Sequence, residues 1–246
     1  MIMQVALFAH GNVGLAIAEF LINRYRDDVV AVVVMSDDAI SRLAVVAGLR
    51  IIHFTSEKQI LSDLPAEFDL GVLAWWPKII RKPLLDIAKS GFINTHPSLL
   101  PFNRGKNYNF WALVENTPFG VTLHKVDGGI DTGDIIAQQP IAYDWTDTGK
   151  TLYQKAQSAM VELFERTWPT IHSGSFLEVP QRDELATFHR AAELEVASKI
   201  VLDQQYRADE LLNLLRARTF HPHPGCWFEV DGQRYEISIE IRKAKL

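Results

Sequence analysis

Short apolar runs alternate with helical stretches through the first part of the chain, and this alternation most constrains the fold. The runs occupy 3–9, 29–35, 50–54, 68–74 and 92–94, and the run 29–35 is rich in β-branched residues. Such runs are typical of strands buried on both faces of a sheet, and the stretches between them carry apolar residues at helical spacing. Strands separated by helices indicate βαβ units, so we predict an α/β fold with a mostly parallel sheet.

Local signals place the ends of the helices. Helices are predicted at 13–24, 39–47, 151–167 and 209–218. Asp37 or Asp38 is expected to cap the second helix and Asp209 the fourth, because short acceptor side chains bind the free amides of a first turn. Pro169 lies just past the third predicted helix, where a helix stop is expected.

The pattern changes after residue 118. Strands are predicted at 120–126 and 135–142, and the tail spells a β-hairpin of 226–230 and 234–242 joined by Asp231-Gly232, a type I′ turn sequence. On its second strand Tyr235, Ile237, Ile239 and Ile241 alternate with polar residues. We therefore predict a catalytic core over 1–178 and a C-terminal extension, with a helix and a hairpin, over 179–246.

Composition excludes several classes of protein. The chain has 246 residues and one cysteine, which excludes a disulfide framework and a multi-cysteine zinc site. A net charge of −5 argues against a protein that mainly binds nucleic-acid backbone. Neither an apolar run long enough to span a membrane nor the basic start of a signal peptide is evident, so we expect a cytoplasmic protein without membrane or nucleic-acid partners.

A glycine turn follows the first predicted strand. Gly11-Asn12-Val13-Gly14 matches the end of a dinucleotide-binding fingerprint, but Ala9 stands where its first glycine is needed. A tight strand-to-helix turn explains these residues equally well. A nicotinamide-dependent oxidoreductase remains an alternative from a different class.

A first chemical candidate lies at the end of the strand predicted at 92–94. Asn94 and His96 stand two residues apart, so they point to one side if the strand continues. Open parallel sheets bind ligands at the carboxyl ends of their strands. An amide can donate to an oxyanion and an imidazole can exchange a proton, although a capping asparagine and a loop histidine are the plainer interpretation.

A second candidate is the loop between the strands predicted after residue 118. Asp131 lies in a stretch with more carboxylates and glycines than a simple turn needs. A polar loop that uses Asp and Gly for turn geometry is the alternative.

Together these stretches resemble the N10-formyltetrahydrofolate-dependent formyltransferase family over roughly residues 3–175. The sequence 94–101, Asn-Thr-His-Pro-Ser-Leu-Leu-Pro, is similar to its signature loop, and His124 followed by Asp131 in Asp-x-Gly-x-Ile is similar to its second signature. The resemblance implies a Rossmann-like core in which Asn94, His96 and Asp131 are catalytic. A formyl transfer of this kind needs no covalent intermediate and no metal.

The segments 104–111 and 215–225 resemble the branch that formylates nucleotide-linked dideoxy amino sugars. The methionyl-tRNA branch carries a C-terminal β-barrel, and the residues after Gly225 are too few for one. The branch implies N10-formyltetrahydrofolate as donor, an amine at C4 of a nucleoside-diphosphate-linked sugar as acceptor, a role in surface polysaccharide such as O-antigen, and a homodimer through the tail hairpin. Other folate-dependent formyltransferases, acting on methionyl-tRNA or glycinamide ribonucleotide, and a non-catalytic sugar-nucleotide-binding module are alternatives.

The resemblance also assigns binding residues, for each of which core packing or a solvated surface is the plainer alternative. Donor-binding residues are expected at Trp75, Trp76, Pro77, Lys78, Ile79, Gly128 and Gly129. Acceptor-binding residues are expected at Arg104, Gly105, Lys106, Asn107, Tyr108, Phe220, His221 and His223. We expect only one of the two adjacent tryptophans to face the cleft, because neighbours on an extended chain point in opposite directions.

Overall fold

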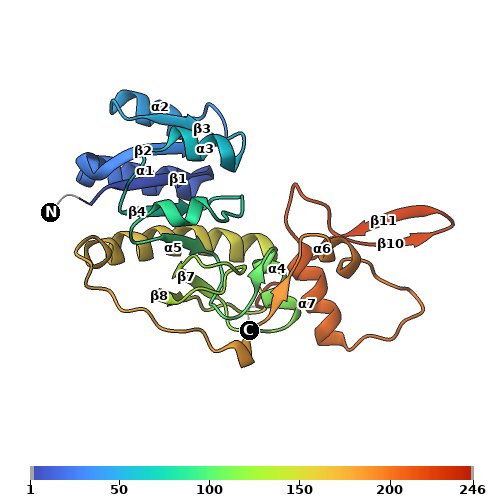
Figure 1. Ribbon diagram of the computed structural model, residues 1–246. Helices are drawn as coiled ribbons and strands as arrows, with labels where there is room; N and C mark the ends of the chain where they lie inside the picture. The colour runs from blue at the N-terminus through green and yellow to red at the C-terminus, as the bar shows by residue number, and fades with distance from the viewer. Residues whose placement is uncertain (1–2, 245–246) are drawn as a thin grey trace. The chain divides into compact units, whose positions relative to one another are not determined.

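The computed structural model describes residues 3–244, which form two compact units (Figure 1). Unit 1 comprises residues 3–96, Thr122–Gln138 and Gln157–Gln181, and unit 2 comprises Pro97–Val121, Gln139–Ala156 and residues 182–244. Within the described residues, none of the helices is both long and apolar enough to cross a membrane.

A seven-stranded sheet forms the frame of the fold, in the order β3-β2-β1-β4-β5-β7-β8. Its strands are β1 (Val5–Ala9), β2 (Val29–Val34), β3 (Ile51–His53), β4 (Leu70–Ala74), β5 (Phe92–His96), β7 (Gly120–Lys125) and β8 (Ile135–Pro140). The pairs from β3 to β5 are parallel, whereas β5 and β7 are antiparallel. The predicted α/β fold with a mostly parallel sheet is therefore confirmed, and β5 extends two residues beyond the predicted end.

Helices cover both faces of the sheet in unit 1 (Figure 1). They are α1 (Gly11–Tyr25), α2 (Ala39–Val46), α3 (Glu57–Asp63), the short η1 (Arg26–Asp28) and η2 (Leu84–Ile87), and the part of α5 (Gly149–His172) from Gln157 onward. On one face Phe20 of α1 meets Phe164 of α5 edge to face, with ring centroids 6.2 Å apart. On the other face Phe8 and Phe92 of the sheet are packed with Ile60 of α3 in the main apolar cluster. Burial of these apolar side chains supplies the main stabilisation of unit 1.

Two predicted helix ends are corrected by the structure. Pro169 lies inside α5 instead of ending it. A proline inside a helix costs ~3 kcal/mol or more, but the fully buried Trp168 and Ile171 on either side of it offset a cost of that size.

The predicted cap of α7 (Ala208–Arg218) is wrong. Asp209 lies in the first turn, after the N-cap residue Arg207, whose guanidinium lies 3.1 and 3.2 Å from the Asp209 carboxylate. The hydrogen bond from Arg207 is the main cause that lowers the pKa of the Asp209 carboxyl. The cap predicted for α2 is confirmed, because Asp38 accepts from the amides of Ile40 and Ser41.

Unit 2 contains the short helices α4 (Tyr108–Val114), η3 (Asp183–Leu185) and α6 (Glu193–Ala197), the longer α7, and two small sheets. Strands β6 (Arg104–Gly105) and β9 (Phe188–His189) form a parallel pair, and α4 packs against α7. A small cluster of Ile200, Leu215 and Cys226 forms its C-terminal core. Burial raises the pKa of the Cys226 thiol to about 12, so this cysteine packs as an apolar side chain.

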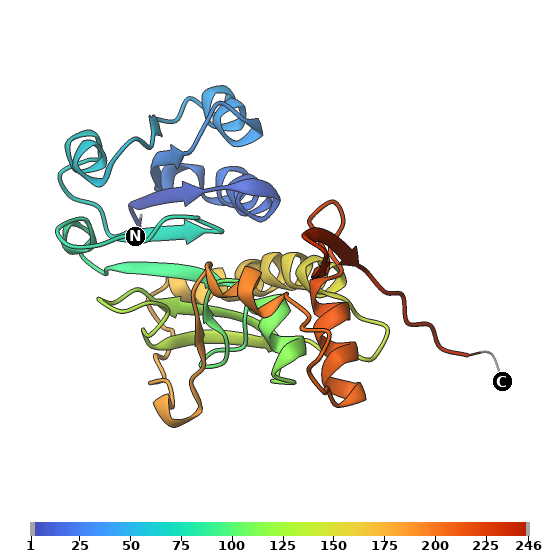
Figure 2. The same cartoon turned by 90° about the vertical axis from the view of Figure 1, so that its right-hand side faces the viewer.

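The predicted hairpin is present as β10 (Cys226–Val230) and β11 (Gln233–Ile237), which Figure 2 shows in dark red beside α7. Asp231 and Gly232 both have positive φ, as a type I′ turn requires. The second strand ends at Ile237 and not near 242, because Cys226, its partner in the ladder, is the first residue of β10.

Candidate active site

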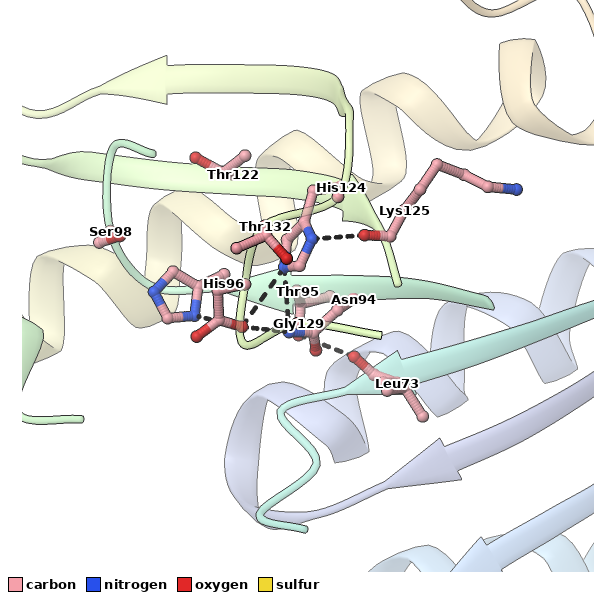
Figure 3. A network of polar contacts seen from close by, with 12 residues as sticks. Leu73, Asn94, Thr95, His96, Ser98, Thr122, His124, Lys125, Gly129 and Thr132 are labelled. Atoms are coloured by element: carbon pink, nitrogen blue, oxygen red, sulfur yellow. Dashed lines mark hydrogen bonds and ion pairs between the residues drawn. The ribbon is translucent and has the colours of Figure 1, made fainter. Parts of the chain in front are cut away.

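Antiparallel pairing of β5 and β7 assembles the polar centre of unit 1. The register places Asn94 opposite His124 and His96 opposite Thr122. Residues opposite each other in a ladder share a face, and Asn94 and His96 share a face because they are two apart. The continuation of β5 to His96 is therefore what brings these three side chains together (Figure 3).

The candidate catalytic residues lie within contact distance of one another. Asp131 Oδ1 lies 3.4 Å from His96 Nδ1 and 3.4 Å from Asn94 Nδ2. The side chain of Asp131 is 13% exposed and that of His96 is 5% exposed. The structure thus groups the three residues that the sequence motifs single out, in a largely desolvated setting where charge and hydrogen bonding act strongly.

His124 completes this group, although the sequence analysis did not include it among the site residues. Its Nδ1 lies 2.7 Å from the carbonyl oxygen of Lys125, which can only accept, so Nδ1 carries a proton. Its Nε2 lies 3.2 Å from Asn94 Nδ2 (Figure 3). With Nε2 as acceptor, His124 takes a hydrogen bond from the Asn94 amide, and the same Nε2 lies 3.6 Å from Asp131 Oδ1. In the sequence, the spacing of His124 and Asp131 within one motif was the feature from which His124 could have been included.

A tight loop presents Asp131. Asp131 has φ +55, a left-handed conformation that Asp tolerates better than most residues. Asp127 Oδ1 accepts from the amide of Gly129 at 3.0 Å and from Thr132 Oγ1 at 2.6 Å. Gly133 passes so close to β7 that a Cβ there would lie 2.0 Å from the carbonyl oxygen of Lys125. In this loop Asp and Gly residues set the turn geometry, as one interpretation of the sequence predicts, and the same turn presents the Asp131 carboxylate.

By residue type and spacing, the centre could also hold a metal ion. Ligand atoms of His96, His124 and Asp131 all lie within 4.8 Å of one another. However, the Asn94 amide nitrogen, a donor that cannot ligate a cation, faces both His124 and Asp131. The donor set is that of a hydrogen-bonded acid–base network.

The two adjacent tryptophans have different environments. Trp75 has φ +56, is half-buried, and donates its amide to Thr95 Oγ1 at 2.8 Å, so the end of β4 is tied to β5. Trp76 is 8% exposed and meets Phe8 and Phe54 edge to face at 5.4 and 5.5 Å. Trp76 is therefore a core residue, whereas Trp75 is partly exposed.

The other expected donor-binding residues lie at the surface of unit 1. Pro77 is half-buried, Lys78 is exposed, and Ile79 is 45% exposed although it is apolar. Gly128 and Gly129 are exposed, and a Cβ at Gly128 would meet nothing within 4 Å.

The segment 104–106 lies in unit 2 and is held by the strand that pairs with it. Arg104 is 8% exposed and its Nη2 lies 2.7 Å from Asp183, so its charge already has a partner. Gly105 has φ +91, and a Cβ there would lie 2.3 Å from the carbonyl oxygen of His189. Lys106 is exposed and is the cation of this segment that faces solvent.

The remaining expected acceptor-binding residues gather aromatic side chains in unit 2. Asn107 precedes α4 with φ +60, and burial raises the pKa of the Tyr108 phenol well above its ordinary value, with a further increase from Tyr153. Tyr153 in turn packs against Phe220, and Phe220 against His223, at 5.4 and 5.0 Å between centroids. His221 and His223 are exposed. Two segments far apart in sequence thus contribute to one aromatic group.

Comparison with known proteins identifies both parts of the chain. Residues 54–167 match the family described as "Formyl transferase", and residues 193–243 match "N-formyltransferase dimerization C-terminal domain". A methionyl-tRNA formyltransferase from Caldanaerobacter subterraneus is 30% identical over 210 residues, which is 82% of this chain. The chain spans 66% of that relative's length and 54% of a methionyl-tRNA formyltransferase from Geobacillus thermodenitrificans.

Solved structures show the same fold at low sequence identity. A 4-N formyltransferase from Francisella tularensis superposes with a TM-score of 0.83, 23% identity and 99% coverage of both chains. An N-formyltransferase from Helicobacter canadensis, in complex with folinic acid and dTDP-3-aminofucose, gives a TM-score of 0.74 and 20% identity, covering 94% of this chain and 85% of that one. The chain therefore belongs to the formyltransferase family of enzymes.

Proposed function

We propose that the protein transfers a formyl group from N10-formyltetrahydrofolate to a primary amine, at C4, of a nucleoside-diphosphate-linked amino sugar. The observation that carries the proposal is the contact group of Asn94, His96 and Asp131, which supplies donors for an oxyanion and a carboxylate beside an imidazole. The family membership supports formyl transfer as the reaction.

The proposed reaction is a direct acyl transfer. The amine nitrogen forms a bond to the formyl carbon, and the carbonyl electron pair moves onto oxygen. His96 and the Asn94 amide stabilise this oxyanion by hydrogen bonds. Asn94 Nδ2 lies 3.4 Å from Asp131 Oδ1, a long hydrogen bond, so the proton directed at Asp131 can be donated to the oxyanion instead. Asp131 stabilises a protonated His96 and assists in taking the proton that the amine loses. Collapse of the intermediate breaks the bond to N10, which takes up the proton that the attacking amine gave to the His96 and Asp131 pair and leaves as the neutral secondary amine of tetrahydrofolate.

The residues of unit 1 fit the donor chemically. Trp75 and the exposed Ile79 offer apolar surface for a pterin ring, and the loop at Gly128 offers backbone groups with open space around them. The bound folate supplies the activated formyl group; the chain's residues bind and orient it. We assign Trp75, Pro77, Lys78 and Ile79 to this side and leave Trp76 in the core.

Unit 2 supplies groups suited to a sugar nucleotide. Lys106 offers a cation for a diphosphate, and Tyr108, whose phenol pKa burial raises further above its ordinary value, offers a hydroxyl. Phe220 and His223 offer stacking surface for a base. The 4-N formyltransferase from Francisella tularensis and the enzyme bound to dTDP-3-aminofucose both share this fold, so the choice of C4 rests on the sequence resemblance.

A second candidate is formylation of methionyl-tRNA, which the 30% identity to such an enzyme favours. One panel separates the two. The purified protein and N10-formyltetrahydrofolate are incubated with methionyl-tRNA and with nucleotide-linked sugars bearing the amine at C3 or C4. We expect one formyl group, detected by mass, on the C4 amino sugar alone. Formylated tRNA with unmodified sugars refutes the proposal.

The exposed lysine of the 104–106 segment provides a prediction. Lys106→Ala is expected to raise KM for the sugar nucleotide several-fold while changing kcat little, because a contact remote from the amine supplies uniform binding. Arg104→Ala is expected to act through stability instead, since it removes a buried ion-pair partner of Asp183. Steady-state kinetics and melting curves measure both. Lys58 is an exposed lysine on α3, and Lys58→Ala is the control. If Lys106→Ala raises KM for the folate and not for the sugar nucleotide, the assignment of Lys106 to the acceptor is wrong.

We propose that residues 1–178 act as the catalytic core and 179–246 as an extension that forms a homodimer. The match of 193–243 to a dimerisation domain supports this. Ile237 and Ile239 pack on the chain's own cluster, but the same hairpin face continues to Val230 and Tyr235, which are 39% and 48% exposed. A hairpin's apolar face is stable in water only when something covers it.

The dimer predicts a concentration-independent mass of two chains in light scattering. Val230→Glu and Tyr235→Glu are expected to give folded monomers, because each places a charge in the interface. Val46→Glu, at an apolar position on α2 that is 88% exposed, is expected to leave the dimer intact. A wild-type monomer at tens of micromolar contradicts the proposal.

A further inference from the structure

The loop that carries Asp131 is held from the β7 side, but its other side has an anchor that the sequence analysis did not find. On the β7 side, the amide of Lys125 donates to the carbonyl of Asp134 at 2.8 Å, and Gly133 lies against the Lys125 carbonyl. On the other side lies the segment that follows α5, at residues 173–181. Asp131 is thus placed by contacts from two separate parts of unit 1.

The second anchor is Gln181. Its Nε2 donates to the carbonyl oxygens of Asp131 at 2.8 Å and of Gly133 at 2.7 Å. An amide NH2 has two protons, so each carbonyl receives one. These are the carbonyls on either side of Thr132, in the part of the loop that turns through the left-handed conformation at Asp131.

The backbone explains why Gln181 reaches these atoms. Val179 and Ile135 exchange two hydrogen bonds, of 2.8 and 2.9 Å, in an antiparallel bridge. Gln181 lies two residues after Val179, and Gly133 lies two residues before Ile135. The antiparallel register therefore places Gln181 opposite Gly133. Because Gly133 has no side chain, nothing from that residue blocks the path of the glutamine amide to the loop.

We infer that Gln181 is a positioning residue for the reaction: its two amide protons fix the backbone of Asp131 and so set the distance of that carboxylate from His96. The inference rests on the proposed function in giving Asp131 a part in formyl transfer. In these two hydrogen bonds Gln181 donates to main-chain carbonyls and not to a catalytic side chain. Its effect is therefore on geometry, and a displacement of about 1 Å at a reacting group can cost ~10²-fold in rate.

Two substitutions separate hydrogen bonding from packing. Gln181→Met keeps the length of the side chain and removes both donors. Gln181→Glu keeps the shape most closely, but its carboxylate only accepts and faces two carbonyl oxygens. If Gln181 matters as a donor, Glu is worse than Met; if it matters as packing, Glu is close to wild type. Gln59→Met is the matched control, because Gln59 is a half-buried glutamine of unit 1 whose amide binds Asp63 in α3.

The first measurement is hydrogen exchange of the loop 127–134, with melting temperature as the measure of global stability. Both Gln181 variants are expected to speed exchange in this loop, more for Glu, while Gln59→Met leaves it unchanged. Crystal structures of the variants are expected to show the contact of Asp131 Oδ1 with His96 Nδ1 longer than the 3.4 Å of the wild type. Unchanged exchange and an unchanged contact overturn the inference, and neither readout depends on which substrate is formylated.

The second measurement is steady-state kinetics. We expect kcat to fall ~10- to 100-fold in Gln181→Met and further in Gln181→Glu, with KM for both substrates changed little. A wild-type kcat in Gln181→Met, or a Glu variant more active than the Met variant, overturns the positioning role. Absence of formyl transfer by the wild type refutes the proposed function, and the exchange and structural measurements still decide whether Gln181 positions Asp131.

Discussion

His96→Asn and Asp131→Asn are each expected to lower kcat by ~10²-fold or more while the protein stays folded. A positioned general acid–base group contributes ~10²- to 10⁴-fold to a rate, and the two side chains lie 3.4 Å apart at the centre of the site. Because they act as a unit, the double variant is expected to lose little more than either single variant. Rates are measured by the mass of the formylated product at saturating substrates.

The choice of substitution at Asp131 follows from its backbone. With φ +55, this residue is in a conformation that asparagine tolerates nearly as well as aspartate, whereas alanine is strained there. Asp131→Asn therefore removes the charge with little change in the loop, and Asp131→Ala adds a loss of stability. Melting curves report this difference. Wild-type turnover in His96→Asn or Asp131→Asn removes that residue from the catalytic group.

Gly133→Ala is expected to reduce both activity and stability. The added Cβ would lie 2.0 Å from the backbone carbonyl oxygen of Lys125, and backbone in the middle of a sheet has no room to move away. The loop must shift, at a cost of about 1–3 kcal/mol in the free energy of unfolding. The shift also displaces Asp131, which is only two residues from Gly133. We expect kcat to fall by an amount comparable to that of the Asp131 variants.

Gly128→Ala is the control that tests whether the loss of stability in Gly133→Ala comes from the close approach of Gly133 to the Lys125 carbonyl. A Cβ at Gly128 meets nothing within 4 Å, so the melting temperature is expected to stay at the wild-type value. A melting temperature of Gly133→Ala equal to that of Gly128→Ala contradicts the argument. Thermal unfolding followed by circular dichroism makes the comparison.

The sequence allowed the prediction of those parts of the site that lie on one continuous element. Asn94 and His96 follow from a single strand, and Asp131 from a single loop. His124 required knowledge of the register between β5 and β7, which a pattern of apolar residues does not give. Gln181 lies 50 residues from Asp131, and its contact depends on an antiparallel bridge formed by a segment without a strand pattern.

Local rules failed where tertiary contacts decided the outcome. Pro169 predicts a helix end, but burial of Trp168 and Ile171 keeps the helix intact past it. Arg104 is predicted to bind the diphosphate of the acceptor, and its ion pair with Asp183, 79 residues away, is a contact that the sequence does not reveal. A charged residue in a motif does not show whether its charge already has a partner.

The ladder between β5 and β7 has a consequence for insertions and deletions. Side chains alternate across a strand, so a slip of one residue between the strands turns every side chain of β7 to the other face. Removing one residue from 121–123, with the start of β7 in place, would bring Lys125 opposite Asn94 in place of His124, or force β5 to bulge. Loss of a single codon in this short strand is therefore expected to be far less tolerated than any conservative substitution within it.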